Sequence, residues 1–293
     1  MFHLLSWLMN MNKKTIILLA PKRTGTTAIF NVFKKHSQVK IAHHDQTIDN
    51  WEPQFWNLAL KAINGEKKIF KDRLKKTFPD IKVSNNLNKE KIFKMWDEIL
   101  KLYGPYIFDK SPQYLNDFKV LKLIHSYNKS RKNVKIFCMI RDPRDAITSQ
   151  FELWNEYTME DNLLKREKNW LKYFQNIEKF KKIFFFPIFK YEDIALNKNK
   201  YFKKIFKHCK LKFEKDSFSQ FKPVSLNRYN MVLHPKIKNW KLSVKMQKHL
   251  KKYGYKKVNF KISYMEKIFF LIKNFKRVIP LKYKNFLKGS FNE

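Results

Sequence analysis

Near the start of the chain, a cluster of basic, hydroxyl-bearing and glycine residues lies between an apolar run and a helical pattern. Residues 15–20 form the run, and apolar residues recur after the cluster at Ile29, Phe30 and Phe33. The cluster consists of Pro21, Lys22, Arg23, Thr24, Gly25, Thr26 and Thr27. A strand, a tight turn and a helix make an anion site, because the first helical amides lack partners and carry the positive end of the dipole. This stretch therefore predicts a phosphate-binding loop, in which glycine allows close approach.

A second group suited to phosphate follows another apolar run, residues 134–140. Arg141 comes directly after the run, Pro143 suits the first turn of a helix, and Ser149 lies further along that helix. A guanidinium group holds phosphate at two points, which lysine cannot do. Only eight of the 63 basic residues are arginine. Arginine in this position therefore indicates a second phosphate contact, and Arg144 lies in the same segment.

Polar side chains also follow two shorter apolar segments. His43, His44 and Asp45 come after a predicted strand at residues 39–42, and Lys110 comes after another at residues 106–108. Open α/β folds bind ligands at the carboxyl ends of their strands. These side chains are therefore candidates for catalytic roles, with the carboxylate or an imidazole as base and the lysine as a cation.

These motifs together resemble those of a known family. The loop resembles the 5′-phosphosulfate loop of sulfotransferases, P-K-[ST]-G-T-T, with one extra basic residue. Residues 141–149 match the family's 3′-phosphate segment, R-[DN]-P-x-[DE]-x-x-x-S, and residues 109–114 resemble the E-K-[ST]-P-x-Y segment of carbohydrate sulfotransferases. Over roughly residues 14–255 the chain resembles sulfotransferases that use 3′-phosphoadenosine 5′-phosphosulfate. Its motifs are most similar in style to those of the carbohydrate, heparan-type and bacterial enzymes.

The resemblance implies sulfonate transfer from this donor, without a metal, to a hydroxyl or amine of an acceptor, with a carbohydrate or glycolipid favoured. It places Lys22 at the leaving 5′-phosphate and Lys110 at the sulfonate. The donor-binding residues that it implies are Lys22, Arg23, Thr24, Gly25, Thr26, Thr27, Arg141, Ser149 and Arg228. Arg228 belongs to a segment that lacks the family's usual glycine.

The catalytic base stays open between three neighbours. Heparan-type enzymes carry a carboxylate in a similar segment, which corresponds to Asp45 here, although the family residue is usually glutamate. Cytosolic sulfotransferases use a histidine, which makes His43 and His44 rivals. All three are taken as candidates.

Apolar strands that alternate with helices predict an α/β fold, a P-loop-like parallel sheet with helices on both faces. We expect an N-terminal extension (residues 1–13), one sulfotransferase domain (residues 14–255) and a basic helical tail (residues 256–293). Residues 262–287 alternate apolar and basic side chains, which is typical of a helix on an anionic membrane or packed on the domain.

The net charge of +38 leaves two rival functions to weigh. A P-loop kinase or NTPase would need lysine after a second glycine, and the loop has neither. A basic nucleic-acid-binding protein fits the charge, but the lysines are dispersed and no recognised nucleic-acid module is present. The chain has two cysteines and no apolar run of membrane-spanning length, so we expect a cytoplasmic enzyme. If it binds a membrane, we expect peripheral contact at the inner face.

Overall fold

The computed structural model describes residues 13–84, 86–153, 162–221 and 242–255. The chain divides into two compact units, the first comprising Met1–Ile140 with Gln175–Pro223 and the second Arg141–Phe174 with Val224–Glu293. Arg228 and the predicted tail lie outside the described residues, as do residues 1–12. The predicted domain limits stay predictions.

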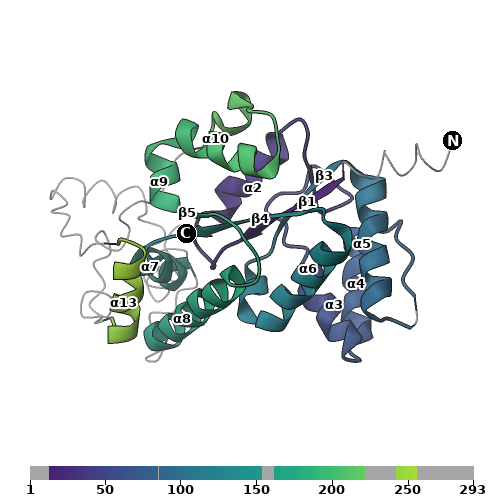
Figure 1. Ribbon diagram of the computed structural model, residues 1–293, viewed down its shortest axis with the longest axis horizontal. Helices are drawn as coiled ribbons and strands as arrows, with labels where there is room; N and C mark the ends of the chain where they lie inside the picture. Colours follow the sequence, from purple (N-terminus) through teal and green to yellow (C-terminus); the bar gives the residue numbers. More distant parts are fainter. Residues whose placement is uncertain (1–12, 85, 154–161, 222–241, 256–293) are drawn as a thin grey trace, which may run out of the picture. The chain divides into compact units, whose positions relative to one another are not determined.

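A five-stranded parallel sheet in the order β2-β3-β1-β4-β5 forms the centre of the first unit (Figure 1). Its strands are β1 (Lys14–Leu19), β2 (Lys40–Ile41), β3 (Tyr106–Lys110), β4 (Val134–Ile140) and β5 (Ile188–Lys190). In β1, Ile16, Ile17, Leu18 and Leu19 are all fully buried. A continuous apolar run is what a strand buried on both faces requires, and β1 and β4 lie where these runs predict.

Helices cover both faces of this sheet, which confirms the predicted α/β fold. In Figure 1, α2 and α10 lie on one face and α3, α5 and α6 on the other. Described helices of the first unit are α2 (Thr26–Lys35), α3 (Phe55–Ile63), α4 (Lys67–Thr77), α5 (Lys89–Tyr103), α6 (Phe118–Arg131), α9 (Tyr191–Leu196) and α10 (Lys198–Cys209), with 3-10 helices η1 (Pro112–Asn116) and η3 (Lys215–Phe218).

Aromatic contacts fix the helices against the sheet. The Phe33 ring of α2 stacks on Phe108 of β3 with centroids 4.1 Å apart. On the other face, the Trp96 indole of α5 donates a 2.7 Å hydrogen bond to the Thr15 hydroxyl in β1. Both contacts join elements far apart in the sequence, so they hold α2 and α5 in place on opposite faces of the sheet.

Helix α4 lies in a highly charged stretch of the chain. Residues 67–77 are helical although charged side chains dominate their sequence. Phe70, Leu74 and Thr77 are buried at spacings of four and three residues, which is the period of a helix. Lysines occupy most of the remaining positions and hide this narrow apolar stripe.

The second unit contains α7 (Pro143–Leu153), the first part of α8 (Asn162–Lys181) and α13 (Val244–Lys252). Ser243 caps α13 by accepting a hydrogen bond from the Met246 amide at 3.2 Å, and its own amide donates to Glu167 Oε1 at 2.9 Å. Phe174 stacks on His249 with centroids 5.3 Å apart. These contacts hold α13 against α8.

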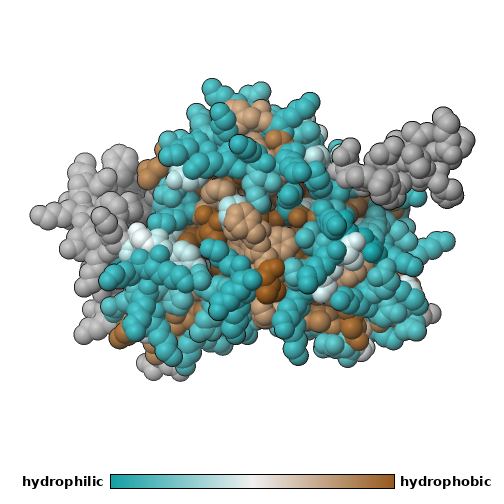
Figure 2. Space-filling model, viewed as in Figure 1, coloured by the Kyte–Doolittle hydropathy of each residue, from teal (hydrophilic) through white to brown (hydrophobic). Residues whose placement is uncertain are grey.

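Hydrophilic side chains dominate the visible surface of α10 in Figure 2, in keeping with the many lysines of the chain. Within the described residues, no helix combines the length and the apolar character that crossing a membrane requires.

Candidate active site

The predicted phosphate loop connects β1 to α2. Gly25 occupies the N-cap position of α2 with φ of +85°, and no side chain caps the helix. The first amides of such a helix have no intrahelical acceptors, so they are available to an anion. Thr24 is fully buried, and its hydroxyl donates to the Pro21 carbonyl oxygen at 2.7 Å. Thr24 therefore closes the turn, while Lys22 and Arg23 bring positive charge beside it.

Gly25 is required for two independent reasons. Its φ of +85° lies in the left-handed region, which residues with a Cβ seldom adopt. A Cβ at this position would also lie 2.4 Å from Cε2 of Tyr191, the first residue of α9. The backbone of the loop therefore lies directly against a buried aromatic ring, which only glycine permits.

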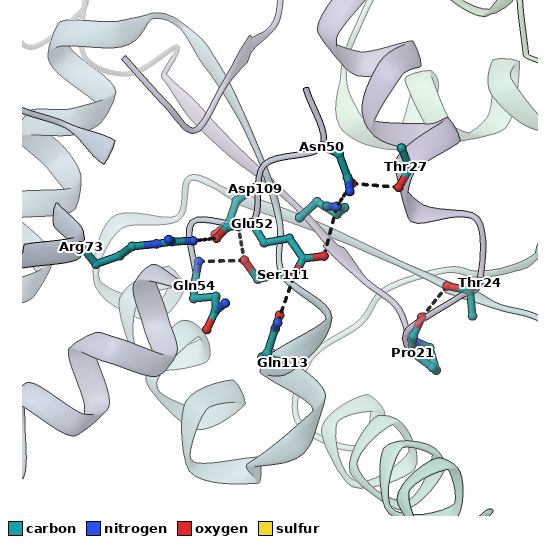
Figure 3. Close-up of polar contacts among 11 residues, drawn as sticks. Pro21, Thr24, Thr27, Asn50, Glu52, Gln54, Arg73, Asp109, Ser111 and Gln113 are labelled. Atoms are coloured by element: carbon teal, nitrogen blue, oxygen red, sulfur yellow. Dashed lines mark hydrogen bonds and ion pairs between the residues drawn. The ribbon is translucent and has the colours of Figure 1, made fainter. Parts of the chain in front are cut away.

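Lys110, at the end of β3, belongs to a polar network with the loop between β2 and α3. Figure 3 shows Asn50, Glu52 and Gln113 of this network. Its ammonium group donates to Asn50 Oδ1 at 2.8 Å and lies 3.3 Å from Glu52 Oε1. Asn50 Oδ1 also accepts a hydrogen bond from the Thr27 hydroxyl, in the first turn of α2, at 2.8 Å. The network thus joins the phosphate loop, a buried cation and a carboxylate.

Electrostatics make this lysine unusual. The Lys110 side chain is only 1% exposed, and burial lowers its pKa, while Glu52 and Asp109 act in the opposite direction. Glu52 is held from its other oxygen as well, because Gln113 Nε2 donates to Oε2 at 2.9 Å. A partly desolvated cation and an oriented carboxylate therefore lie side by side.

A buried chain of hydrogen bonds through Asp109, here termed the relay, supports the segment that contains Glu52. Asp109 is completely buried and accepts hydrogen bonds from the Tyr114 hydroxyl at 2.7 Å and the Ser111 hydroxyl at 3.2 Å. Ser111 Oγ in turn accepts from the Gln54 amide at 3.0 Å. Gln54 has φ of +56°, rare for a residue with a Cβ, so the relay holds a turn that would otherwise relax. Burial raises the pKa of Asp109 to about 7.

The three predicted base candidates lie after β2, in the same loop but with other partners. Asp45 is exposed, and its Oδ1 accepts from the Thr47 amide at 2.8 Å and from the Thr47 hydroxyl at 2.6 Å; these bonds lower its pKa. His43 is 3% exposed, and burial lowers its pKa. His44 is exposed and its Nδ1 lies 3.1 Å from the Thr77 carbonyl oxygen.

The predicted 3′-phosphate residues belong to the second unit. Arg141 directly follows β4, is 2% exposed, and donates to Asp145 Oδ2 at 3.3 Å. Ser149 is 1% exposed on α7. Arg144 Nε donates to Asp142 Oδ1 at 2.9 Å, which fixes the turn into α7. Within the described parts of the chain, no group of histidine, cysteine or carboxylate side chains has the arrangement of a metal site.

Comparison with known proteins identifies the family of the chain. A family model described as the sulfotransferase family matches residues 15–215. The chain belongs to the sulfotransferase family. It is therefore an enzyme of sulfonate transfer, and sulfotransferases of this family use 3′-phosphoadenosine 5′-phosphosulfate. No curated protein sequence matches the chain.

Two solved structures share the fold of this sulfotransferase. One is the sulfotransferase domain from the curacin biosynthetic pathway, with a TM-score of 0.55 at 15% identity, covering 83% of this chain and 98% of that one. The other is the sulfotransferase domain from the Synechococcus PCC 7002 olefin synthase, with a TM-score of 0.55 at 15% identity, covering 84% and 95%. At this identity the likeness concerns the fold alone.

Glu52 and Asn50 are the site residues that the sequence analysis missed. Glu52 stands between a tryptophan and a proline just before α3, and it is one of 25 acidic residues. Its contact with Lys110 spans 58 positions, so no local pattern indicates it. The one available signal was its place after β2, at the edge of the sheet where ligands bind.

Proposed function

We propose that this sulfotransferase moves the sulfonate of 3′-phosphoadenosine 5′-phosphosulfate to a hydroxyl or amine of a carbohydrate or glycolipid acceptor. The observation that carries sulfonate transfer is the convergence of Thr27 and Lys110 on Asn50 Oδ1, at 2.8 Å each, beside the carboxylate of Glu52. The acceptor class rests on the resemblance of residues 109–114 to the segment of carbohydrate sulfotransferases. Thr27 belongs to the phosphate loop, and Lys110 and Glu52 are a cation and a base within reach of it.

The residues at the start of α2 fit the 5′-phosphate end of this donor. The uncapped start of α2, the close backbone at Gly25 and the charge of Lys22 suit a 5′-phosphate. The remaining donor residues that we propose are Arg23, Thr24, Thr26 and Thr27 for the same group, and Arg141, Ser149 and Arg228 for the 3′-phosphate. The donor supplies an activated sulfonate, which the protein's own side chains do not carry.

Transfer of a sulfonate needs positioning, positive charge and a proton acceptor. Lys22 and Lys110 stabilise the negative charge that develops on the phosphate and sulfonate oxygens. We propose Glu52 as the base that takes the acceptor proton, because its carboxylate is oriented by Lys110 and Gln113. Asp45, His43 and His44 are the alternatives, and their contacts lead away from Lys110.

Calorimetric titration with 3′-phosphoadenosine 5′-phosphate tests the donor site. The 3′-dephosphorylated analogue and magnesium-ATP are the controls. We expect tight binding that needs the 3′-phosphate and that weakens at least tenfold in Lys22→Ala and in Arg141→Ala. Equal or better binding of magnesium-ATP would contradict this proposal and favour a kinase.

The base is tested by the rate of 3′-phosphoadenosine 5′-phosphate formation with a panel of carbohydrate acceptors. Glu52→Gln keeps the shape of the side chain and removes its basicity, and we expect a loss of about 10²–10⁴-fold in kcat. Asp45→Asn, His43→Gln and His44→Gln are matched variants. A comparable loss in one of them, with Glu52→Gln active, would move the base to that residue.

We also propose cytoplasmic placement with peripheral contact between residues 262–287 and anionic membranes, on the basis of the alternating basic and apolar sequence alone. Sedimentation with vesicles containing phosphatidylglycerol, compared between the full chain and a chain ending at residue 261, tests it. Unchanged binding after the deletion would contradict the proposal.

A further inference from the structure

A second cationic group lies beside Glu52, on the side away from the phosphate loop. Arg73 of α4 places its guanidinium carbon 4.1 Å from the centroid of the Trp51 ring, and its Nη2 donates to the Glu52 carbonyl oxygen at 2.6 Å. Figure 3 shows Arg73 on one side of Glu52 and Thr24 and Thr27 on the other. This cation is therefore fixed next to the proposed base without belonging to the donor loop.

Lys76 adds a second charge on the same side of α4. It follows Arg73 by three positions, which places the two side chains on one helix face, and its ammonium group lies 5.9 Å from the Trp51 centroid. In the described part of the chain, neither Arg73 nor Lys76 forms an ion pair. Glu52 is the nearby acid, and its carboxylate is already held by Lys110 and Gln113.

The tryptophan and histidine beside these cations carry further polar atoms that lack a partner in the part of the chain that the structure describes. His43 Nδ1 lies 3.0 Å from the Asp45 amide nitrogen and 3.2 Å from the Asp45 carbonyl oxygen. His43 Nε2 and Trp51 Nε1 are both buried and have no hydrogen-bond partner within the described structure. The two rings meet edge to face, with centroids 4.6 Å apart. Positive charge thus lies close to the Trp51 N–H donor and the His43 Nε2 atom, neither of which is paired among the described residues.

Such a group is suited to a negatively charged partner that carries hydrogen-bond acceptors. Burial lowers the pKa of Arg73, while the charge of Glu52 acts in the opposite direction; an anion beside the guanidinium would compensate for the water that it has lost. Its fork of N–H groups matches the two oxygens of a carboxylate, phosphate or sulfate. One guanidinium nitrogen is committed to Glu52, which leaves other N–H groups of the fork to such a ligand.

We propose that the acceptor of this sulfotransferase carries an anionic group, a carboxylate, phosphate or sulfate, which Arg73 and Lys76 bind beside Trp51. The inference rests on the proposed function, since it places the acceptor at Glu52. An anion held at Arg73, which contacts the Glu52 carbonyl oxygen, keeps the rest of the acceptor next to the residue that we propose as the base. An uncharged acceptor lacks this anchor and reaches the base with lower affinity.

Four probes test the inference in the presence of saturating 3′-phosphoadenosine 5′-phosphate, which occupies the donor loop. They are glucose, glucuronate, glucose 6-phosphate and glucose 6-sulfate, with affinities measured by calorimetry or ligand-observed NMR. We expect at least one anionic sugar to bind tenfold or more tightly than glucose. The strongest of the three identifies the charged group.

Matched variants separate a local site from the general attraction of a chain of charge +38. Arg73→Gln and Lys75→Gln each remove one positive charge from α4, but Lys75 is exposed, and the described cations over the Trp51 ring are Arg73 and Lys76. We expect Arg73→Gln to reduce the preference for the anionic sugar at least fivefold and Lys75→Gln to leave it unchanged. Equal losses in both, or no preference in the wild type, would overturn the inference.

Two further measurements keep the result decisive. Because Arg73 packs on Trp51, Lys76→Gln provides a milder variant should Arg73→Gln unfold in a thermal melt, and we expect it to lower the preference as well. The affinity for 3′-phosphoadenosine 5′-phosphate is measured for every variant. Wild-type protein that fails to bind this nucleotide contradicts the proposed function, and the sugars are then compared without it, where the Arg73 dependence still decides the inference.

Discussion

Lys110 and Glu52 lie 3.3 Å apart although 58 positions separate them in the chain. Lys110 is held at the end of β3, and Glu52 enters from the loop that follows β2. The two strands are neighbours in the sheet, so parallel pairing alone brings their carboxyl ends together. The pair leaves a buried ammonium group within reach of the phosphate loop.

Lys110→Met removes this buried charge while keeping the length of the side chain. We expect kcat to fall by about 10²–10³-fold, the usual cost of deleting one preorganised charge-stabilising group. Affinity for 3′-phosphoadenosine 5′-phosphate, measured by calorimetry, should change less than threefold. Lys61→Met, which breaks an exposed pair with Glu66, is the control and should retain full activity. Normal turnover by Lys110→Met would exclude the lysine from catalysis.

The sequence predicts those parts of the site that depend on local order. The apolar run before Lys22 and the run before Arg141 locate β1 and β4, because strands buried on both faces have few polar residues. Glu52 could not be found this way, since its role depends on pairing between β2 and β3. Arg73 was missed because α4 shows lysine at most of its surface positions.

Ser111→Ala tests whether the relay beneath the site positions Glu52. The change removes the acceptor of the Gln54 amide and a donor to Asp109, so the positive φ at Gln54 loses its support. We expect the free energy of unfolding to fall by about 1–3 kcal/mol, and kcat to fall more than nucleotide affinity. Denaturant titration and steady-state kinetics measure the two effects. Ser219→Ala, at an exposed serine, should be neutral in both.

Gly25→Ala tests the close approach of the loop backbone. The new alanine would have to adopt φ of +85°, and its Cβ would lie 2.4 Å from Cε2 of Tyr191, so the ring would have to move. Both stability and nucleotide binding should therefore fall. We expect a loss of about 1–3 kcal/mol in the free energy of unfolding. Adding Tyr191→Leu should restore part of the nucleotide affinity, because it relieves the contact but not the backbone strain. Equal affinity in wild type and Gly25→Ala would show that the loop tolerates a side chain.

The raised pKa of the buried Asp109 carboxyl predicts a specific dependence of stability on pH. Burial raises its pKa to about 7 in the folded protein, whereas an unfolded aspartate has a pKa of about 4. The folded state therefore binds the proton more tightly, so this contribution to stability is complete below pH of about 4 and is lost as pH rises to about 7. Three pKa units correspond to about 4 kcal/mol at most.

Asp109→Asn removes this titration while preserving the shape of the side chain. We expect the difference in free energy of unfolding between wild type and variant to shift against the wild type as pH rises from about 4 to about 7, and then to stay constant. Denaturant titrations at closely spaced pH values measure it. Asp117→Asn is the matched control, since Asp117 is exposed at the N-cap of α6, where asparagine caps equally well. If the wild-type and Asp109→Asn curves ran parallel over this range, the buried carboxyl would be ionised throughout, and its hydrogen bonds from Tyr114 and Ser111 would outweigh its burial.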